Sequence, residues 1–192
     1  MKINNTSFDY FKHNYNETWT NERHIEVSLG IYFLNKFDFN CIEIGAVMPH
    51  YDYVAKLVID PRDDYQNCYR INALDYSYVN ENVLSISTIE HFKTDEFNRT
   101  DYDSITCLCK IINESKNYLI TWPIGYNKIL DNYVKSSNIP RFILKRKNIE
   151  NEWEIDENIN NFDYIYNRST EPIVTGFPFA NAICIITNLT FS

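Results

Sequence analysis

The sequence predicts an α/β fold with a mostly parallel sheet, and two observations carry this prediction. Apolar runs typical of buried strands occur at Cys41–Ile44, Leu57–Ile59 and Val83–Ser87, and helical patterns alternate with them along the chain. Each run passes into small or polar residues at its carboxyl end, such as Gly45 and Asp60. Because ligands of open parallel sheets bind outside the carboxyl ends of the strands, the functional residues are expected there.

The N-terminal segment, from about residue 16 to residue 37, is predicted to form a helix that packs on the sheet. Thr18 or Thr20 would cap this helix, Glu22 lies in its first turn, and the helix would end near Phe37. The apolar residues that recur at helical spacing and should face the sheet are Ile25, Leu29, Tyr32, Phe33 and Phe37.

The rest of the chain continues the alternation of strands and helices. The third strand is predicted at Tyr69–Asn72 and the fifth at Tyr118–Trp122, where Pro123 stops it. An amphipathic helix precedes the fifth strand and a short helix follows it, at Asp101–Lys116 and Lys128–Lys135. Three further strands are predicted, the first two as a hairpin: Arg141–Lys145, Glu152–Ile155 and Ala182–Asn188.

The connections between the first three strands are shorter than this fold class usually has. Only about ten residues separate the first strand from the second, whereas a parallel crossover usually needs a dozen or more. Ala46–Val54 therefore has room for one or two helical turns at most. Since the 192 residues show no linker and no internal repeat, we expect one domain with shortened early crossovers.

Composition and charge narrow the class of partner. A net charge of −8 argues against nucleic acid as the main partner, because a phosphate backbone attracts basic surfaces. The basic run Arg141–Lys147 is the local exception; it is either the solvated face of a strand or a contact for an anionic substrate. No apolar stretch approaches the roughly 18 residues of a membrane span, so no membrane contact is expected. The many aromatic residues are compatible with a homodimer.

The five cysteines fit a reduced, cytoplasmic setting. Their number is odd, and most lie in apolar runs as small buried thiols. Cys107 and Cys109 are the one close pair, and an isolated C-x-C does not predict a metal site. The heavy use of Asn, Ile, Lys and Tyr indicates an AT-rich genome, such as a viral one, and carries no functional signal.

The turn after the first strand distinguishes between classes of nucleotide ligand. A dinucleotide site needs G-x-G-x-x-G so that the backbone can approach a pyrophosphate, and only Gly45 is present here. S-adenosylmethionine (SAM) has no phosphate and is compatible with a looser turn; alternatively, Gly45 is a plain turn residue. Asp60 is either a ribose-binding acid or the first residue of an Asp-Pro turn. Asp75 either accepts from an adenine amino group or is a cap or loop carboxylate.

Six blocks follow one another along the chain: Asn21–Leu29, Ile42–Tyr51, Asp60-Pro61, Leu84–Phe92, Leu119–Asn127 and Phe177–Ala182. Together they resemble small bacterial and viral class I SAM-dependent methyltransferase-like proteins, a group often found among glycan-modifying genes. The resemblance implies a Rossmann-like methyltransferase sheet with SAM across the ends of the first, second and fourth strands. The sequence departs from the broad superfamily by lacking a multi-glycine first motif and the Pro-Gly-Gly turn before the fifth strand.

The same resemblance assigns the cofactor contacts. Glu43 and Gly45 match the first motif, and Asp60 matches the ribose-binding acid. Ala46, in the same turn as Gly45, is also predicted to bind the cofactor. The motif after the fourth strand corresponds to Ser87–His91, in which Ser87 and Thr88 would contact SAM. Asp75 completes the predicted cofactor site.

Methyl transfer to a sugar hydroxyl is helped by a general base, and His91 is the predicted one. The ordinary pKa of histidine, roughly 6.5, suits a base at neutral pH. Glu90 would orient His91 or bind the acceptor; alternatively, both residues begin a capped helix or a loop. His50, just after the glycine turn, is a second candidate base near the methionine part of SAM.

The end of the fifth strand is predicted to form the wall of the acceptor site. Trp122 and Tyr126 would stack against a sugar or a base, and Asn127 would hydrogen-bond a polar acceptor. Packing in the core accounts for either ring equally well.

Three functions follow from these residues. The first is a SAM-dependent O-methyltransferase acting on a saccharide or another small polar acceptor. The second is a catalytically silent domain that keeps the fold as a binding or assembly module, which the thin first motif favours. The third is a nucleic-acid methyltransferase, which the acidic charge disfavours. No target-base motif of the Asn/Asp-Pro-Pro-Tyr/Phe type follows the fourth strand either.

Overall fold

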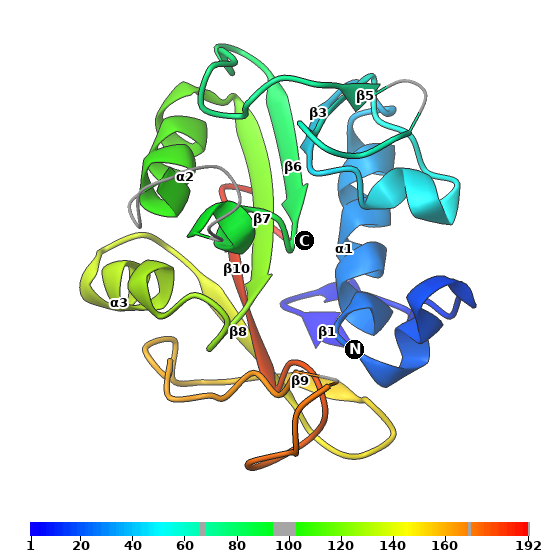
Figure 1. Cartoon of the computed structure of the whole chain (residues 1–192), viewed down its shortest axis with the longest axis vertical. Coiled ribbons are helices and arrows are strands. Elements are labelled where there is room, and N and C mark those ends of the chain that lie inside the picture. Colours follow the sequence, from blue (N-terminus) through cyan, green and yellow to red (C-terminus); the bar gives the residue numbers. More distant parts are fainter. Residues whose placement is uncertain (66–67, 94–102, 169, 192) are drawn as a thin grey trace.

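A computed structural model describes residues 1–65, 68–93, 103–168 and 170–191 of the chain. Its centre is an eight-stranded sheet in the order β5-β4-β3-β6-β7-β10-β8-β9, with helices on both sides of it (Figure 1). The strands are β3 (Ile42–Ile44), β4 (Leu57–Ile59), β5 (Cys68–Tyr69), β6 (Asn82–Ile86), β7 (Asn117–Pro123), β8 (Phe142–Arg146), β9 (Trp153–Ile155) and β10 (Ala182–Thr187).

The sheet is mostly parallel, which confirms the predicted α/β class. Strands β5, β4, β3, β6 and β7 pair in parallel, each with its neighbour. Strand β10 lies antiparallel between β7 and β8, and β8 and β9 form the predicted antiparallel hairpin. The third predicted strand is shorter than expected, because the pairing of β5 ends at Tyr69.

The strands send alternate side chains into two separate cores, one on each face of the sheet. In β10, Ile183 and Ile185 belong to the first core, whereas Cys184 and Ile186 belong to the second. The first core lies beneath α1 and the second beneath α2 and α3, on the opposite side of the sheet in Figure 1. The helices are α1 (Arg23–Lys36), α2 (Asp103–Glu114) and α3 (Lys128–Ser136).

The early crossovers are as short as predicted. Between β3 and β4 the chain makes a single 3-10 turn, η2 (Met48–Tyr51). After β6 the chain makes a second such turn, η3 (Ile89–Lys93). In the described ranges, the carboxyl ends of β3 and β6 are thus each followed by a short 3-10 turn.

The N-terminal segment differs from the prediction. Helix α1 begins at Arg23, and a 3-10 segment, η1 (Tyr15–Thr20), precedes it. Thr18 does not cap the helix, because its hydroxyl donates to the Phe11 carbonyl and accepts from the His13 amide. The Asn21 side chain accepts from the Arg23 amide instead. A two-stranded hairpin, β1 (Lys2–Ile3) with β2 (Thr6–Ser7), was not predicted because each strand is only two residues long.

The basic run at residues 141–147 proves to be mainly structural. Arg141 and Arg146 are buried and donate to main-chain carbonyl oxygens, and Lys145 pairs with Glu154 across the hairpin. The five cysteines are free thiols. In the described ranges, no helix is both long and apolar enough to cross a membrane, and no group of three or more His, Cys, Asp or Glu side chains is placed so that it could hold a metal ion.

Candidate ligand-binding site

A cavity of about 380 Å³ lies over the carboxyl ends of β3, β4 and β6. In a sheet whose order is third-second-first-fourth-fifth, the first and fourth strands flank the point where the order of connections reverses, and ligands bind outside that point. Here β3 and β6 are those strands. The predicted residues that line the cavity are Gly45, Ala46, His50, Asp60, Ser87, Thr88 and His91.

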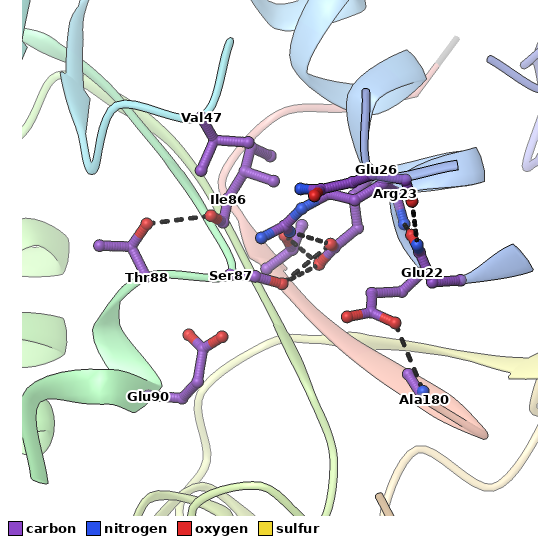
Figure 2. Close-up of polar contacts among 12 residues, drawn as sticks. Glu22, Arg23, Glu26, Val47, Ile86, Ser87, Thr88, Glu90 and Ala180 are labelled. Atoms are coloured by element: carbon purple, nitrogen blue, oxygen red, sulfur yellow. Dashed lines mark hydrogen bonds and ion pairs between the residues drawn. The ribbon is translucent and has the colours of Figure 1, made fainter. Parts of the chain in front are cut away.

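Gly45 is required by the contact between two turns. Its φ is +83°, and a Cβ built on it would lie 2.0 Å from the Oγ1 atom of Thr88. Thr88 in turn donates from Oγ1 to the Ile86 carbonyl, so its side chain is fixed (Figure 2). The glycine thus lets the turn after β3 pack directly on the turn after β6. Both turns line the cavity, so this contact sets its shape.

Asp60 combines the two roles that the sequence left open. Its Oδ1 accepts from the amides of Arg62 and Asp63, at 2.8 and 3.1 Å, which is the expected Asp-Pro turn. Within the described residues Oδ2 takes no hydrogen bond, and the side chain lines the cavity. One carboxylate oxygen therefore holds the turn while the other is available to a ligand.

Glu43 lies beneath the cavity and does not line it. The side chain is fully buried, and its Oε1 accepts from the amides of Val47 and Met48 at 2.9 and 2.7 Å. Burial raises the pKa of this carboxyl to about 8, although the two amides lower it. Glu43 thus fixes the main chain of the turn that does line the cavity.

A buried acidic cluster lies beside the cavity and consists of Glu22, Glu26 and Glu90 around Arg23 (Figure 2). Glu26 has no exposed surface and accepts from Arg23 at 2.6 Å, from Thr121 at 2.7 Å, and from the Ser87 hydroxyl at 2.8 Å on both carboxylate oxygens. Arg23 and Ser87 also line the cavity. The charge of the cluster is thus connected to the cavity by direct contacts.

Glu90 is the unsatisfied member of this cluster. Only 1% of it is exposed, and neither carboxylate oxygen has a hydrogen-bond partner among the described residues. Its Oε1 lies 3.6 Å from Nε2 of His91. Burial, with the charges of Glu26 and Glu22 adding to it, raises the pKa of Glu90 well above its usual range. Burial and the charge of Glu26 raise the pKa of Glu22 in the same direction.

His91 is held in its neutral form. Burial of the ring and the positive charges of Arg23, Arg62 and Arg168 lower its pKa to about 4. About half of the side chain remains exposed, and the ring packs edge-on against Tyr126 with centroids 4.6 Å apart. A neutral imidazole at the cavity is the form that accepts a proton.

His50 forms part of an aromatic group at the mouth of the cavity. The ring stacks on Tyr15 with centroids 4.7 Å apart and planes 10° from parallel, and its Nε2 lies 3.1 Å from Asp63. Tyr15 and Asn16 also line the cavity. Asn16 has φ +55°, a left-handed conformation that asparagine tolerates better than most residues. The segment before α1 therefore covers one side of the site.

Besides Glu43 and Glu90, four further predicted site residues do not line the cavity. Trp122 is fully buried in the second core, where its indole donates to Asp131 at 2.9 Å, so the packing alternative is correct for it. Asn127 is buried and caps α3, because its side chain accepts from the amides of Ile129 and Leu130. Asp75 is exposed outside the cavity. Tyr126 contacts His91 from beside it.

The acidic cluster and Arg23 were not predicted from the sequence. The signal was present, because Glu22, Glu26, Leu29 and Phe33 share one face of a helix at spacings of three and four residues. Two acids on the helix face that packs against a sheet are expected to be buried, and buried acids need cations or hydrogen-bond donors as partners. Arg62, which also lines the cavity, had no such signal because it lies in an irregular turn.

Comparison with the known protein families, with curated proteins and with solved structures finds no match to this chain.

Proposed function

We propose that the protein is a SAM-dependent methyltransferase that acts on a saccharide or another small polar acceptor. The observation that carries the proposal is the position of the cavity, outside the ends of β3 and β6 where a doubly wound sheet reverses its connections. At about 380 Å³ the cavity has the size of a site for a small molecule or cofactor. The Rossmann-like strand order of β5 to β7 and the sequence resemblance support the same class.

The turn after β3 supports SAM over a nucleotide phosphate. SAM carries a positive sulfonium and, in its methionine part, a carboxylate, and the lining of the cavity holds both signs of charge, with Asp60 and Asp63 beside Arg23 and Arg62. The single glycine of the turn after β3 is used for the contact with Thr88, so this turn has no glycine-rich cradle for a pyrophosphate. The donor set therefore fits a cationic nucleoside.

The residues present would hold SAM as follows. Asp60 Oδ2 would accept from the ribose hydroxyls, and the turn at Gly45 and Ala46 would support the rest of the nucleoside. When bound, SAM supplies an electrophilic methyl group. The neutral His91 imidazole would accept the proton of the acceptor hydroxyl, and Glu90, 3.6 Å away, would stabilise the imidazolium that forms. Because the pKa of Glu90 is raised, this support grows as the pH rises.

The test is calorimetric titration of the protein with SAM and with S-adenosylhomocysteine. We expect binding of both, and a loss of about tenfold or more in Asp60→Asn, because one charge-assisted acceptor is removed. Asparagine keeps Oδ1 for the turn, so the variant separates ligand binding from turn stability. Asp64→Asn is the matched control, since Asp64 is an exposed acid that pairs with Arg70. Equal affinity of Asp60→Asn and the unaltered protein would remove Asp60 from the site.

A second candidate is a silent module with the same fold. It is favoured because the protein's own side chains already occupy the turn after β3. The amides of Val47 and Met48 donate to Glu43 and are not free for a ligand, and the Thr88 side chain occupies the space beside Gly45. Absence of binding by both nucleosides, in protein that remains folded, would favour this candidate over the methyltransferase.

A further inference from the structure

A second cavity, of about 400 Å³, lies on the other side of the start of α1. Its lining comes from three places: Lys12 and Trp19 before the helix, His24 in its first turn, and Arg146 with Glu150 at the β8–β9 turn. None of these residues lines the first cavity. The second cavity is therefore a separate candidate site, and it does not depend on the proposed methyltransferase function.

Arg146 gives this cavity a buried positive charge whose hydrogen-bond partners are all neutral. The side chain is 7% exposed and makes four hydrogen bonds, all to main-chain carbonyl oxygens: Asn148, Thr20, Pro178 and Ile149. Within the described ranges no carboxylate forms a hydrogen bond or ion pair with Arg146, and the charge of the buried Glu22 acts on it only from a distance. Since a guanidinium has five N–H donors, one N–H on Nη2 remains. A buried cation whose partners are all neutral attracts an anion.

His24 adds an unused hydrogen-bond acceptor. Its Nδ1 lies 3.2 Å from the Asn151 carbonyl oxygen, which can only accept, so Nδ1 carries the proton. Nε2 is then an acceptor, and it has no partner among the described residues although the side chain is only 3% exposed. The ring is held in place by stacking on Tyr10, with centroids 4.7 Å apart. A ligand that satisfied Nε2 would have to supply a donor.

Trp19 supplies an apolar surface at the same cavity. Its indole is 40% exposed, whereas Trp122 and Trp153 are buried and donate to Asp131 and Asn151. A large exposed ring beside charged groups is typical of a contact for a flat or ring-shaped ligand. Lys12 brings a second positive charge and Glu150 an acceptor for donor groups.

We propose that this second cavity binds an acidic saccharide, with a pyranose ring on Trp19, its carboxylate at Lys12 and Arg146, and its hydroxyl groups toward His24 and Glu150. The ligand must combine a negative charge, a ring face and several hydroxyl donors. An aromatic acid has no donors for His24 and Glu150, and a neutral sugar has no charge for Lys12 and Arg146. A sugar acid has all three.

The experiment is titration of the full chain with D-glucuronate, followed by the indole N–H resonance of Trp19 in NMR spectra. We expect saturable binding that shifts this resonance and leaves those of the two buried tryptophans unchanged. Glucose and benzoate, which each lack one required feature, should bind at least about tenfold more weakly. Equal binding of glucose, or no binding of glucuronate, would overturn the proposal. Tighter binding of uridine monophosphate would replace the saccharide by a nucleotide.

Two variants locate the site. Lys12→Met should weaken glucuronate binding about fivefold, the scale of a partly exposed ion pair. Lys147→Met is the matched control, because Lys147 is an exposed lysine next to Arg146 that does not line the cavity. Trp19→Ala, at an exposed position, should abolish the NMR signal of the contact and weaken binding without unfolding the protein. Unchanged affinity in both Lys12→Met and Trp19→Ala would exclude this cavity.

Discussion

Arg23 and Arg146 are two largely buried arginines on either side of the start of α1, and their surroundings are opposite. Arg23 is surrounded by the carboxyl groups of Glu22, Glu26 and Glu90, whereas Arg146 donates its hydrogen bonds only to neutral carbonyl oxygens. Around Arg23 the acids outnumber the bases, whereas the acids near Arg146, Glu22 and Glu150, make no direct contact with it. Consecutive residues of one helix, Arg23 and His24, thus line two different cavities.

The largest expected difference between the two regions is the effect of removing each arginine. Arg23→Met leaves buried carboxyl groups without their cation and should lower the free energy of unfolding by about 3 kcal/mol at pH 7. The deficit should shrink toward pH 5, because protonation of Glu22 and Glu90, whose pKa values are raised, removes the uncompensated charge. Urea unfolding at several pH values measures both effects.

Arg146→Met should behave differently. It removes hydrogen bonds to carbonyl oxygens, at a cost of about 1–3 kcal/mol, and it leaves no unpaired acid. Its deficit should change less between pH 5 and pH 7 than that of Arg23→Met, because no acid contacts Arg146 directly. If the two variants show the same pH profile, the contrast between an arginine in direct contact with acids and one without such contacts is wrong.

How far the sequence predicted these regions depends on the range of the interactions that form them. The strands β3, β4, β6, β7 and β10 were predicted to within a residue or two, because their apolar runs are local signals. The residues at their carboxyl ends were also found, since parallel strands bring their ends to one edge. Seven of these predicted residues, including Gly45, Asp60 and His91, line one cavity.

The missed features depend on contacts between distant segments. Glu26 meets Ser87 and Thr121 across 61 and 95 residues, and Asn151 contacts His24 across 127. Contacts between such distant residues produce no regular pattern in the sequence from which they could be predicted. Trp122 was misplaced for a related reason. A tryptophan at a strand end has the same sequence pattern whether it packs in a core or lines a site, and the hydrogen bond to Asp131 that places it in the core is visible only in the structure.

Glu90 provides the next sharpest test of the acidic region. Because folding raises the pKa of Glu90, ionisation of this carboxyl destabilises the folded protein. This destabilisation is absent at low pH and grows as the pH rises above the ordinary value of 4.5 toward the raised pKa. Glu90→Gln should therefore stabilise the protein at pH 8, by about 1–2 kcal/mol, and change little at pH 4. Thermal unfolding across this range measures the difference. Glu150→Gln, an exposed acid at the second cavity, is the control and should show no such trend.

The smallest expected effect is at His24, and its sign is opposite to that of Glu90. Burial lowers the pKa of His24, and Lys12 and Arg146 lower it further, while the Asn151 carbonyl works against them. The neutral ring is favoured by folding, so its contribution is present above the unfolded value of roughly 6.5 and is lost as the pH falls below that value. Replacement by glutamine, which keeps a donor for Asn151 and does not titrate, should make the protein less sensitive to acid between pH 6.5 and pH 5. If wild type and His24→Gln lose stability in parallel over that range, the second cavity does not carry the positive charge that distinguishes it from the first.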